Sequence, residues 1–390
     1  MNAPLYSEAR DWLSGNGAYA CPARAHHGLW FERFYAGFSQ QDWSVPKPSK
    51  DGGDEVKRNW VQSVSGAVGD AKALDNAADR LVDLIAARHG DFRCLHTDWH
   101  FVTGLGLPHP IENGFAWHPT LAVPYLGGAA VKGLLRAYLE AWEDPVDLEK
   151  LKRWFGTAKK SDVPERAGDL VFFDALPIKP PRLGCDVMTP HMGKWYELGG
   201  DNPLDPKVTP ADWHSPVPVP FPVVEDATLL FGIAPRRYAD AEQNQATADL
   251  AAAMDGLVQA LDWLGAGAKT AAGYGHMQPD NGSDTRLREA LAERRSKRAA
   301  AKTLEQMGPS ERKVQQHLEK HPGNPAVELL RAIESGVFTD PETVRVAARK
   351  AQAAMQADGT WMPDFSGANK TRLKHRDRSR KIRDFLEPGD

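Results

Sequence analysis

The sequence predicts an α+β protein, with a mixed core of strands and helices between helical segments. Two observations lead to this prediction. Between residues 91 and 280, short apolar stretches of strand type are separated by two amphipathic helices. Before residue 91 the pattern is mainly helical, and after about residue 285 the composition changes to Ala, Arg, Glu and Lys with few aromatic residues.

Length and composition set the broad class. A chain of 390 residues is long enough for more than one folding unit, and 42% apolar with 26% charged residues is typical of a globular protein. No run of about twenty apolar residues occurs, so we expect no membrane segment. Residues 1–10 lack the pattern of a secretory signal. Cys21, Cys94 and Cys185 form no C-x-x-C pair, so we expect a cytoplasmic, reducing environment.

Charge is distributed unevenly along the chain. The formal net charge is −4, which is not typical of a nucleic-acid-binding protein as a whole. Residues 1–280 hold 26 Lys and Arg against 36 Asp and Glu, whereas residues 281–390 hold 22 against 16. A polyanion contact in the first part must therefore be a local patch, and the last part is a separate, basic segment.

The first ninety residues predict a helical elaboration over residues 1–90. Aromatic residues between Leu29 and Phe38 have the pattern of a core cluster. The prolines and glycines of 45–53 indicate a loop. The stretch 71–89 predicts a helix, with an apolar stripe at Leu74, Leu81, Leu84 and Ile85.

The first half of the core, which spans residues 91–280, begins with a strand over 92–102, where apolar and polar residues alternate. A loop rich in glycine and proline follows at 104–110. A helix is then expected over 129–142, because its apolar residues keep helical spacing.

The second half of the core holds most of the strand patterns. Strands are expected over 169–178 and 228–234, and a shorter one over 185–188. Residues 199–222 are rich in Gly, Pro and Asp and indicate an insertion or long loop. A strongly amphipathic helix is expected over 247–264, and a last strand over 271–277.

The order of these elements is β-α-β-β-α-β, which is the pattern of a ferredoxin-like, RRM-like domain. A sheet of this type is a common platform for RNA. Residues 285–390 then form a basic helical C-terminal extension, broken near 308–309 and 321–323. Its last segment, 370–383, holds eight Lys and Arg and one acidic residue, Asp377, so it is either a solvated or disordered charged stretch or a docking tail for RNA or a partner.

Two glycine-rich segments, 124–136 and 265–275, are the main candidates for function. Lys269-Thr270 follows Ala268 rather than glycine, and the expected helix precedes this loop, so neither a Walker A loop nor a dinucleotide fingerprint fits. The end of helix 247–264 that faces the loop is its C-terminus, which is unfavourable for phosphate. We therefore do not expect nucleoside triphosphate binding.

Each segment has a structural and a functional interpretation. The glycines of 265–275 fit a helix C-cap with close packing, or a loop whose amides and Lys269 hold a sugar-phosphate backbone. Lys132 and Arg136 are spaced i,i+4 and share a face, near a helix start where free amides favour an anion. The alternative is a surface helix with two solvated bases. Tyr125, Tyr274 and Trp195 either stack on bases or pack.

Catalytic chemistry is weakly indicated. His96 and His100 can converge on one face of a strand, but structural or solvated histidines, metal ligands and RNA contacts all remain open for the cluster around them. Acidic residues near the glycine segments form no pair with a compelling spacing. We expect no active site, no metal and no cofactor.

Several motifs together resemble one protein family. These are His118-Pro119, Pro124-Tyr125-Leu126-Gly127-Gly128, Lys132-Gly133 with Arg136, Trp154-Phe155-Gly156, residues 168–175 and residues 265–275. They resemble the RAMP superfamily of CRISPR-associated RNA-binding proteins. Ala129 and Ala130 stand where this family usually has serines. The motifs at 104–110 and 186–191 further resemble a subunit of the type III-B (Cmr) effector complexes.

The resemblance covers roughly residues 90–280 and implies a non-catalytic subunit that binds crRNA and caps the filament near the crRNA 3′ side. Its implied partners are the backbone RAMP subunit, the small helical subunit, a neighbouring capping RAMP subunit and, indirectly, target RNA. Spacing and resemblance together assign RNA contacts to Gly127, Gly128, Lys132, Arg136, Gly265, Gly267, Lys269, Thr270, Gly273, Tyr274, His109 and His191.

Two other functions remain open. Some RAMP relatives cleave precursor guide RNA with a histidine, so the chain is alternatively an endoribonuclease that acts through His109 or His118. A protein-only scaffold, which retains no RNA, is the third possibility.

Overall fold

The computed structural model describes residues 21–22, 25–35, 37–39, 41–42, 44–45, 53–143, 145–157, 165–199, 202–236 and 243–387, apart from the side chains of residues 53, 54 and 243. The chain folds into two compact units, residues 1–291 and 292–390. The boundary lies within the long helix α9 (Asn281–Gln306).

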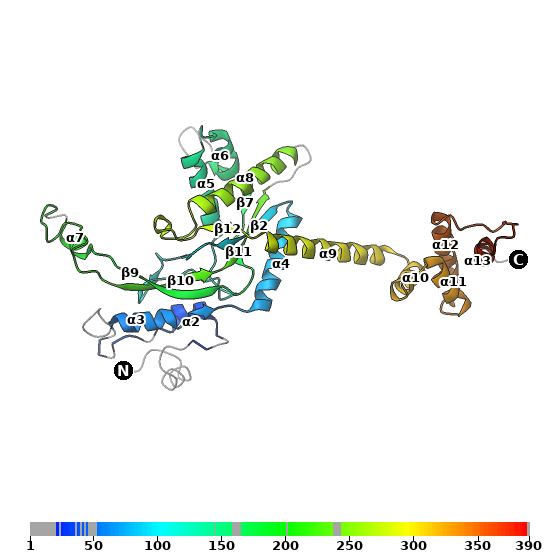
Figure 1. The fold of residues 1–390 in the computed structure, drawn as a ribbon, viewed down its shortest axis with the longest axis horizontal. Helices are drawn as coiled ribbons and strands as arrows, with labels where there is room; N and C mark the ends of the chain where they lie inside the picture. Colours follow the sequence, from blue (N-terminus) through cyan, green and yellow to red (C-terminus); the bar gives the residue numbers. More distant parts are fainter. Residues whose placement is uncertain are drawn as a thin grey trace. The chain divides into compact units, whose positions relative to one another are not determined.

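A five-stranded antiparallel sheet forms the centre of the first unit (Figure 1). Its strand order is β12-β2-β11-β7, and β8 also pairs with β11. The strands are β2 (Asp91–Thr97), β7 (Leu170–Phe172), β8 (Leu176–Pro177), β11 (Thr228–Pro235) and β12 (Met277–Pro279).

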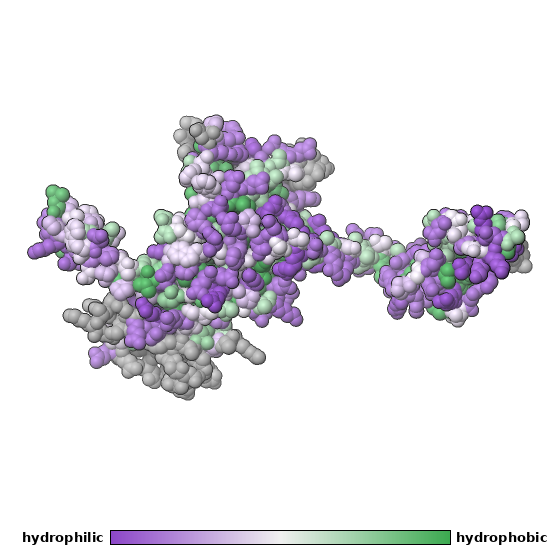
Figure 2. Space-filling model, in the orientation of Figure 1, coloured by the Kyte–Doolittle hydropathy of each residue, from purple (hydrophilic) through white to green (hydrophobic). Residues whose placement is uncertain are grey.

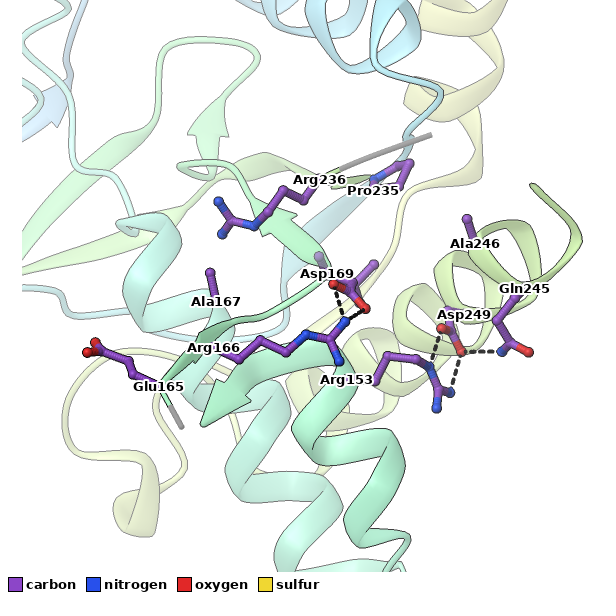
Figure 3. A pocket seen from close by; sticks show the side chains of 11 residues that line it. Arg153, Glu165, Arg166, Ala167, Asp169, Pro235, Arg236, Gln245, Ala246 and Asp249 are labelled. Carbon is purple, nitrogen blue, oxygen red and sulfur yellow. Dashed lines mark hydrogen bonds and ion pairs between the residues drawn. The ribbon is translucent and has the colours of Figure 1, made fainter. Parts of the chain in front are cut away.

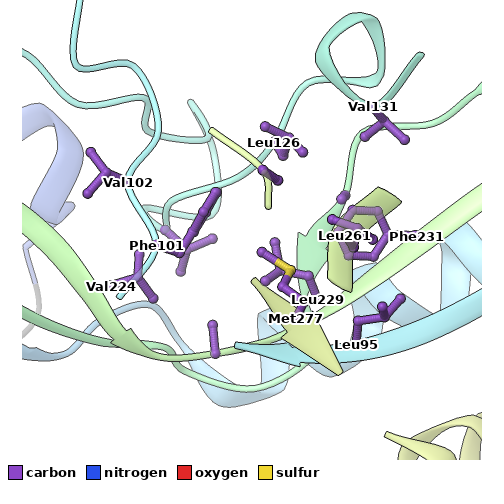
Figure 4. Packing of buried hydrophobic residues seen from close by; sticks show 14 of the residues in the cluster. Leu95, Phe101, Val102, Leu126, Val131, Val224, Leu229, Phe231, Leu261 and Met277 are labelled. Carbon is purple, nitrogen blue, oxygen red and sulfur yellow. The ribbon is translucent and has the colours of Figure 1, made fainter. Parts of the chain in front are cut away.

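Two helices cover one face of this sheet. They are α5 (Gly128–Trp142) and α8 (Gln243–Trp263), which pack on each other and on the strands. Leu95, Leu229 and Phe231 of the sheet meet Val131 and Leu261 of the helices in the main hydrophobic core (Figure 4). Burial of these side chains is the main force that holds the helices to the sheet.

The opposite face of the sheet is covered as well. Helix α4 (Ala71–Ala87) packs on β2, β8 and β11. Cys94 and Leu230 form a second buried cluster with Ile85 of α4 and with Leu287, in the first turns of α9. Because successive residues of β11 point to opposite faces, Leu229 and Leu230 enter different clusters. Both faces of the sheet are therefore covered.

A second sheet, of order β1-β9-β10, lies in the same unit. Helix α3 (Gly53–Gln62) packs on β9 and β10. These two strands are joined through residues 189–218, which carry α7 (Gly193–Leu198) and exposed apolar side chains, among them Leu204 and Trp213. The strands are β1 (Gly66–Ala67), β9 (Arg182–Met188) and β10 (Val219–Asp226).

Short elements complete the first unit. The helix α2 (His27–Arg33) precedes α3, and α6 (Leu148–Phe155) follows α5. The remaining pieces are the strand pairs β3 (Pro108–His109) with β4 (Glu112–Asn113) and β5 (Gly156–Thr157) with β6 (Arg166–Ala167), and the 3₁₀ turn η2 (Thr270–Ala272).

The second unit has a helical core of its own. Its helices are α10 (Pro309–Lys320), α11 (Pro325–Glu334), α12 (Pro341–Ala357) and α13 (Lys370–Leu386). Asn324, Asp340 and Asn369 cap the starts of α11, α12 and α13 by accepting hydrogen bonds from backbone N–H groups. The buried residues are mainly Ala, Leu and Ile, as in Leu329 and Ile382.

The mixed helical and antiparallel architecture confirms the predicted α+β class. The helices expected over 129–142 and 247–264 are present as α5 and α8, with small shifts at their ends. The loop expected over 199–222 gives way to β10 at residue 219. Residues 46–52 of the loop expected over 45–53 lie outside the described residues.

Three expected strands differ from those observed. The last strand, expected over 271–277, is present only as β12 at 277–279, because η2 occupies 270–272 and Gly273 and Gly275 have φ of +89° and +78°, incompatible with extended backbone. The strand over 169–178 is divided into β7 and β8. The strand over 92–102 ends at residue 97, and residues 101 and 102 form only isolated bridges.

Among the described residues, none of the helices is both long and apolar enough to span a lipid bilayer.

The cover over the sheet is testable at two neighbouring residues of α4. Ile85 is fully buried against Gly232 of β11, whereas the Leu84 side chain is 49% exposed. We predict that Ile85→Ala lowers the free energy of unfolding by about 2–5 kcal/mol and that Leu84→Ala changes it by about 0.5 kcal/mol or less. Equal losses in chemical denaturation of the two variants would contradict this packing.

Candidate nucleic-acid interface

The fold brings the two glycine-rich segments together. A cavity of about 380 Å³ separates them. Its walls are mainly apolar side chains and glycines, so it offers shape rather than charge. The lining residues are Leu126, Ala130, Leu134, Leu264, Gly265, Ala266, Gly267 and Thr270.

The basic residues of α5 do not face this cavity. Successive residues of a helix are about 100° apart, so Lys132 lies about 200° around the axis from Ala130. The Lys132 Nζ donates a hydrogen bond to the Phe155 carbonyl at 2.8 Å, and Arg136 Nε donates to Glu140 Oε1 at 2.7 Å. The two segments therefore meet without forming one basic site.

The start of α5 already holds a carboxylate. Leu126 and Ala175 form an antiparallel bridge, which places Asp174 beside the first turn. The Gly128 N–H donates to Asp174 Oδ1 at 2.6 Å. A Cβ at Gly128 would lie 2.3 Å from the Phe172 carbonyl oxygen, so only glycine fits there. The expectation that this turn offers free amides to an anion is thus corrected for Gly128, because Asp174 occupies that amide.

Lys132 instead belongs to a small positive cluster. Burial lowers the pKa of Lys132, and the positive charges of Arg236 and Arg136 lower it further. Arg236 Nε donates to the Gly168 carbonyl at 2.6 Å, and this guanidinium has no carboxylate partner in the described part of the chain. An anion here would relieve the repulsion among these cations.

A larger cavity of about 630 Å³ lies next to Arg236 (Figure 3). Its other arginines are neutralised: Arg153 forms a two-bond pair with Asp249 at 2.7 and 2.8 Å, and Arg166 pairs with Asp169 at 2.8 Å. The Arg236 side chain extends away from these two pairs. Arg236 is therefore the arginine of this cavity that has no carboxylate partner among the described residues, and its positive charge acts on Lys132.

Close packing explains several glycines of the second segment. Gly267 has φ of +86°, and a Cβ there would lie 2.0 Å from the Val102 carbonyl oxygen. At Gly275 the same atom would lie 1.9 Å from the Ala266 carbonyl oxygen, and Gly265 is similarly crowded by Tyr274. Close packing thus accounts for these three glycines, whereas Gly273 faces open space apart from Trp99.

Many amides of this loop are also engaged. The N–H groups of Ala268 and Gly275 donate to the carbonyls of Val102 and His100, and the N–H of Gly273 donates to Thr270. The loop therefore lies along residues 98–102 and uses these amides to hold itself there. These particular amides are not free to bind an anion, which leaves such a contact to the side chains of the loop.

Lys269 is the side chain best placed for that role. It adopts the left-handed conformation with φ of +61°, which is uncommon for a residue other than glycine and is often found at functional sites. Its Nζ lies 5.4 Å from the ring centre of Phe221 and 5.7 Å from that of Tyr274. Each cation–π contact of this kind stabilises the position of the ammonium group by about 0.5–1 kcal/mol.

An aromatic platform adjoins Lys269. The rings of Trp99 and His100 are stacked, with centres 4.6 Å apart, and Trp99 also packs 4.8 Å from Tyr274. Trp99 is 48% exposed, whereas Tyr274 is buried. The sequence predicts an RNA contact for Tyr274 and none for Trp99, but in the structure Trp99 has the exposed ring.

Asp186 holds this aromatic platform in place through Tyr274 and His100. It accepts hydrogen bonds from the Tyr274 hydroxyl and the Val187 N–H, and His100 Nδ1 lies 3.6 Å from its Oδ2. Burial alone would raise the pKa of Asp186, but the Tyr274 and Val187 bonds and nearby His100 hold that pKa below its ordinary value. Burial and then the Asp186 carboxylate raise the pKa of Tyr274, so Tyr274 stays a neutral donor.

The predicted histidine contacts lie elsewhere. His109 stacks on Phe31 with ring centres 4.4 Å apart and its Nε2 bonds to the Phe31 carbonyl at 2.8 Å, while burial lowers its pKa. His191 bonds through Nδ1 to the His214 carbonyl at 2.6 Å, within the β9–β10 connection. His118 Nδ1 accepts from Leu121 N–H at 3.3 Å. No group of three or more metal-ligand side chains occurs among the described residues.

In a comparison with protein families, residues 95–278 match the sequence model of the RAMP superfamily. The matched segment belongs to the RAMP superfamily. It contains Trp99, Lys132, Arg236 and Lys269, whereas unit 2 lies beyond its end. The resemblance identified from the sequence motifs is therefore confirmed.

A curated relative carries a more specific name. The CRISPR system Cmr subunit Cmr6 of Pyrococcus furiosus is 35% identical over 161 residues, which is 40% of this chain and 42% of the relative. The alignment thus spans less than half of either protein.

Two solved structures are similar over part of the chain. The type III-B Cmr-beta complex bound to cognate target RNA contains a chain that is 20% identical, with a TM-score of 0.42, covering 58% of this chain and 70% of that one. The crystal structure of Cmr6 from Pyrococcus furiosus is 24% identical, with a TM-score of 0.29, covering 49% of this chain and 98% of that one.

The packing role of the loop glycines gives a test with a matched control. We predict that Gly267→Ala destabilises the first unit by about 2 kcal/mol or more, because it adds left-handed strain and displaces the Val102 carbonyl. Gly133→Ala, in the middle of α5 with open space around it, should stabilise by about 0.5–1 kcal/mol. Thermal and denaturant unfolding compare the two, and a neutral Gly267→Ala would show that the glycine is not needed for packing.

Proposed function

We propose that this chain is a crRNA-binding subunit of a type III-B CRISPR (Cmr) effector complex, comparable to the sixth subunit. The observation that carries the proposal is the 35% identity to the relative named Cmr6, together with the RAMP match over the candidate interface. In this proposal the subunit caps the filament near the crRNA 3′ side, in the cytoplasm, as part of antiviral defence.

The proposed mode of binding is sequence-independent. Lys269 meets a phosphate, and an unpaired base stacks on Trp99, a contact worth about 1–3 kcal/mol. Lys132 and Arg236, whose positive charges repel each other, form a second phosphate site, and Arg136, which is paired with Glu140, lies beside it. Gly127, Gly128, Gly265, Gly267, Thr270 and Gly273 shape the backbone around these side chains.

The five-stranded sheet serves as a scaffold in this proposal. Its strand order, with α5 and α8 on one face, fits a ferredoxin-like domain. The other face, on which RRM domains stack bases, is covered by α4, so RNA lies at the loops beside the sheet.

The surroundings of the histidines fit a subunit that positions RNA without cleaving it. His109 is held by Phe31 in a buried stack, and His118 accepts backbone N–H groups. Within the described residues, neither is hydrogen-bonded to a carboxylate that would activate it as a base. Target cleavage is then left to other subunits of the complex, and the expected neighbours are the backbone RAMP subunit, the small helical subunit and the adjacent capping RAMP subunit.

The interface is testable by charge reversal. We predict that Lys269→Glu and Trp99→Ala each weaken binding of a guide-length RNA about tenfold, because they remove a phosphate contact and a stacking contact. Lys72→Glu, on the exposed side of α4, is the matched charge control and should have a much smaller effect. Fluorescence anisotropy with the full chain measures the affinities, and equal losses for Lys72→Glu and Lys269→Glu would contradict the assignment.

Two further outcomes separate the alternative functions. Metal-independent cleavage of repeat RNA that is abolished by His109→Ala or His118→Ala would replace the binding subunit by an endoribonuclease. Assembly with the other type III-B subunits without any RNA retention would indicate a protein-only scaffold. We expect co-purification with those subunits, retention of guide RNA and no cleavage by the chain alone.

A further inference from the structure

The second unit holds a basic helix that the proposed function does not use. The RAMP match ends at residue 278, before this unit begins. Residues 292–390 contain 20 Lys and Arg against 14 Asp and Glu, and α13 alone contains eight Lys and Arg against two acids. The visible face of this unit is mostly hydrophilic (Figure 2).

One flank of α13 is tied to the preceding loop. Arg380 Nε donates to the Pro363 carbonyl at 2.8 Å, and Arg383 pairs with Asp364 at 3.2 Å. The Arg372 guanidinium lies 5.7 Å from the ring centre of Phe365. These contacts, with buried Ile382, fix how α13 is rotated about its axis.

The other flank presents a row of bases. Lys370, Lys374 and Arg378 follow at i, i+4 and i+8, so they share a face and rise about 6 Å per step. Lys374, Arg378 and Lys381 line a groove of about 310 Å³ between α11 and α13, called here the α11–α13 groove. Its other lining residues are Val327, Leu330, Arg331, Glu334 and Asp377.

The acidic residues of this groove do not neutralise the row of Lys370, Lys374 and Arg378. Glu334 is taken by Lys381 at 2.6 Å, and Asp377 by Arg376 at 2.8 Å. Lys374 and Arg378 have no ion pair within the described residues. The groove therefore keeps uncompensated positive charge on a helix whose orientation is fixed.

We propose that the α11–α13 groove is a second RNA site, which binds the phosphate backbone of a single strand. A row of evenly spaced cations fits a polymer with one charge per nucleotide better than a single anion. No exposed aromatic ring lines the groove, so the contact is independent of base sequence. The choice of RNA over an acidic protein segment rests on the proposed function, in which the same chain already binds RNA.

The test uses the full chain and a fluorescent single-stranded RNA of mixed sequence. The double variant Lys374→Glu, Arg378→Glu should weaken binding about tenfold and reduce the slope of log K against log salt by about 1.4, the loss expected for two phosphate contacts. The matched control is Arg345→Glu, Arg349→Glu, which makes the same charge change at the same spacing on exposed positions of α12. It should alter affinity and slope much less.

Several outcomes would overturn the proposal. Equal effects of the two double variants would show that RNA is attracted by the overall charge of the chain and is not bound in the groove. Unchanged RNA affinity with lost binding to another type III-B subunit would reassign the groove to a protein. Lys374→Gln, Arg378→Gln, checked by circular dichroism, guards against misfolding and should lower the slope in the same direction. Loss of binding with Lys269→Glu but not with either α13 variant would sink this inference and leave the proposed function standing.

Discussion

Cover on both faces of the central sheet is the constraint on which the rest of the structure depends. Leu229 and Leu230 are adjacent in β11, yet each is fully buried in a different cluster, one under α5 and α8 and the other under α4. A base cannot stack on strands that are covered in this way. In the proposed function RNA is therefore recognised by the loops beside the sheet, where residues 98–102 and the second glycine-rich segment lie together.

Hydrogen bonds within the protein also limit which backbone groups of those loops are free to bind an anion. Asp174 occupies the Gly128 amide at the start of α5, and carbonyls of residues 100 and 102 occupy loop amides. Fewer backbone amides are therefore free to bind an anion, and in the proposed function side chains make the main contacts with RNA. Lys269 and the Lys132 cluster supply charge, while Trp99 supplies an exposed ring.

Periodicity was sufficient for the elements whose packing is local in sequence. The apolar stripes of α5 and α8 predicted both helices, because burial of one face is visible in the spacing of their residues. The last strand begins at residue 277 rather than 271, because glycines in the left-handed region interrupt extended backbone without changing the hydrophobicity of the pattern. Asp174 at the start of α5 and Trp99 on Tyr274 depend on contacts between distant segments, which a pattern along the chain does not encode.

Photo-crosslinking of the full chain to guide RNA carrying 4-thiouridine, with the attached peptides identified by mass spectrometry, tests the central claim most directly. The claim is that RNA passes over the platform of Trp99, Tyr274 and Lys269 and not over the sheet. The account predicts crosslinks in the peptides that contain residues 98–102 and 269–275. Crosslinks concentrated on β11 or on the inner side of α4, which require the cover to open, would contradict it.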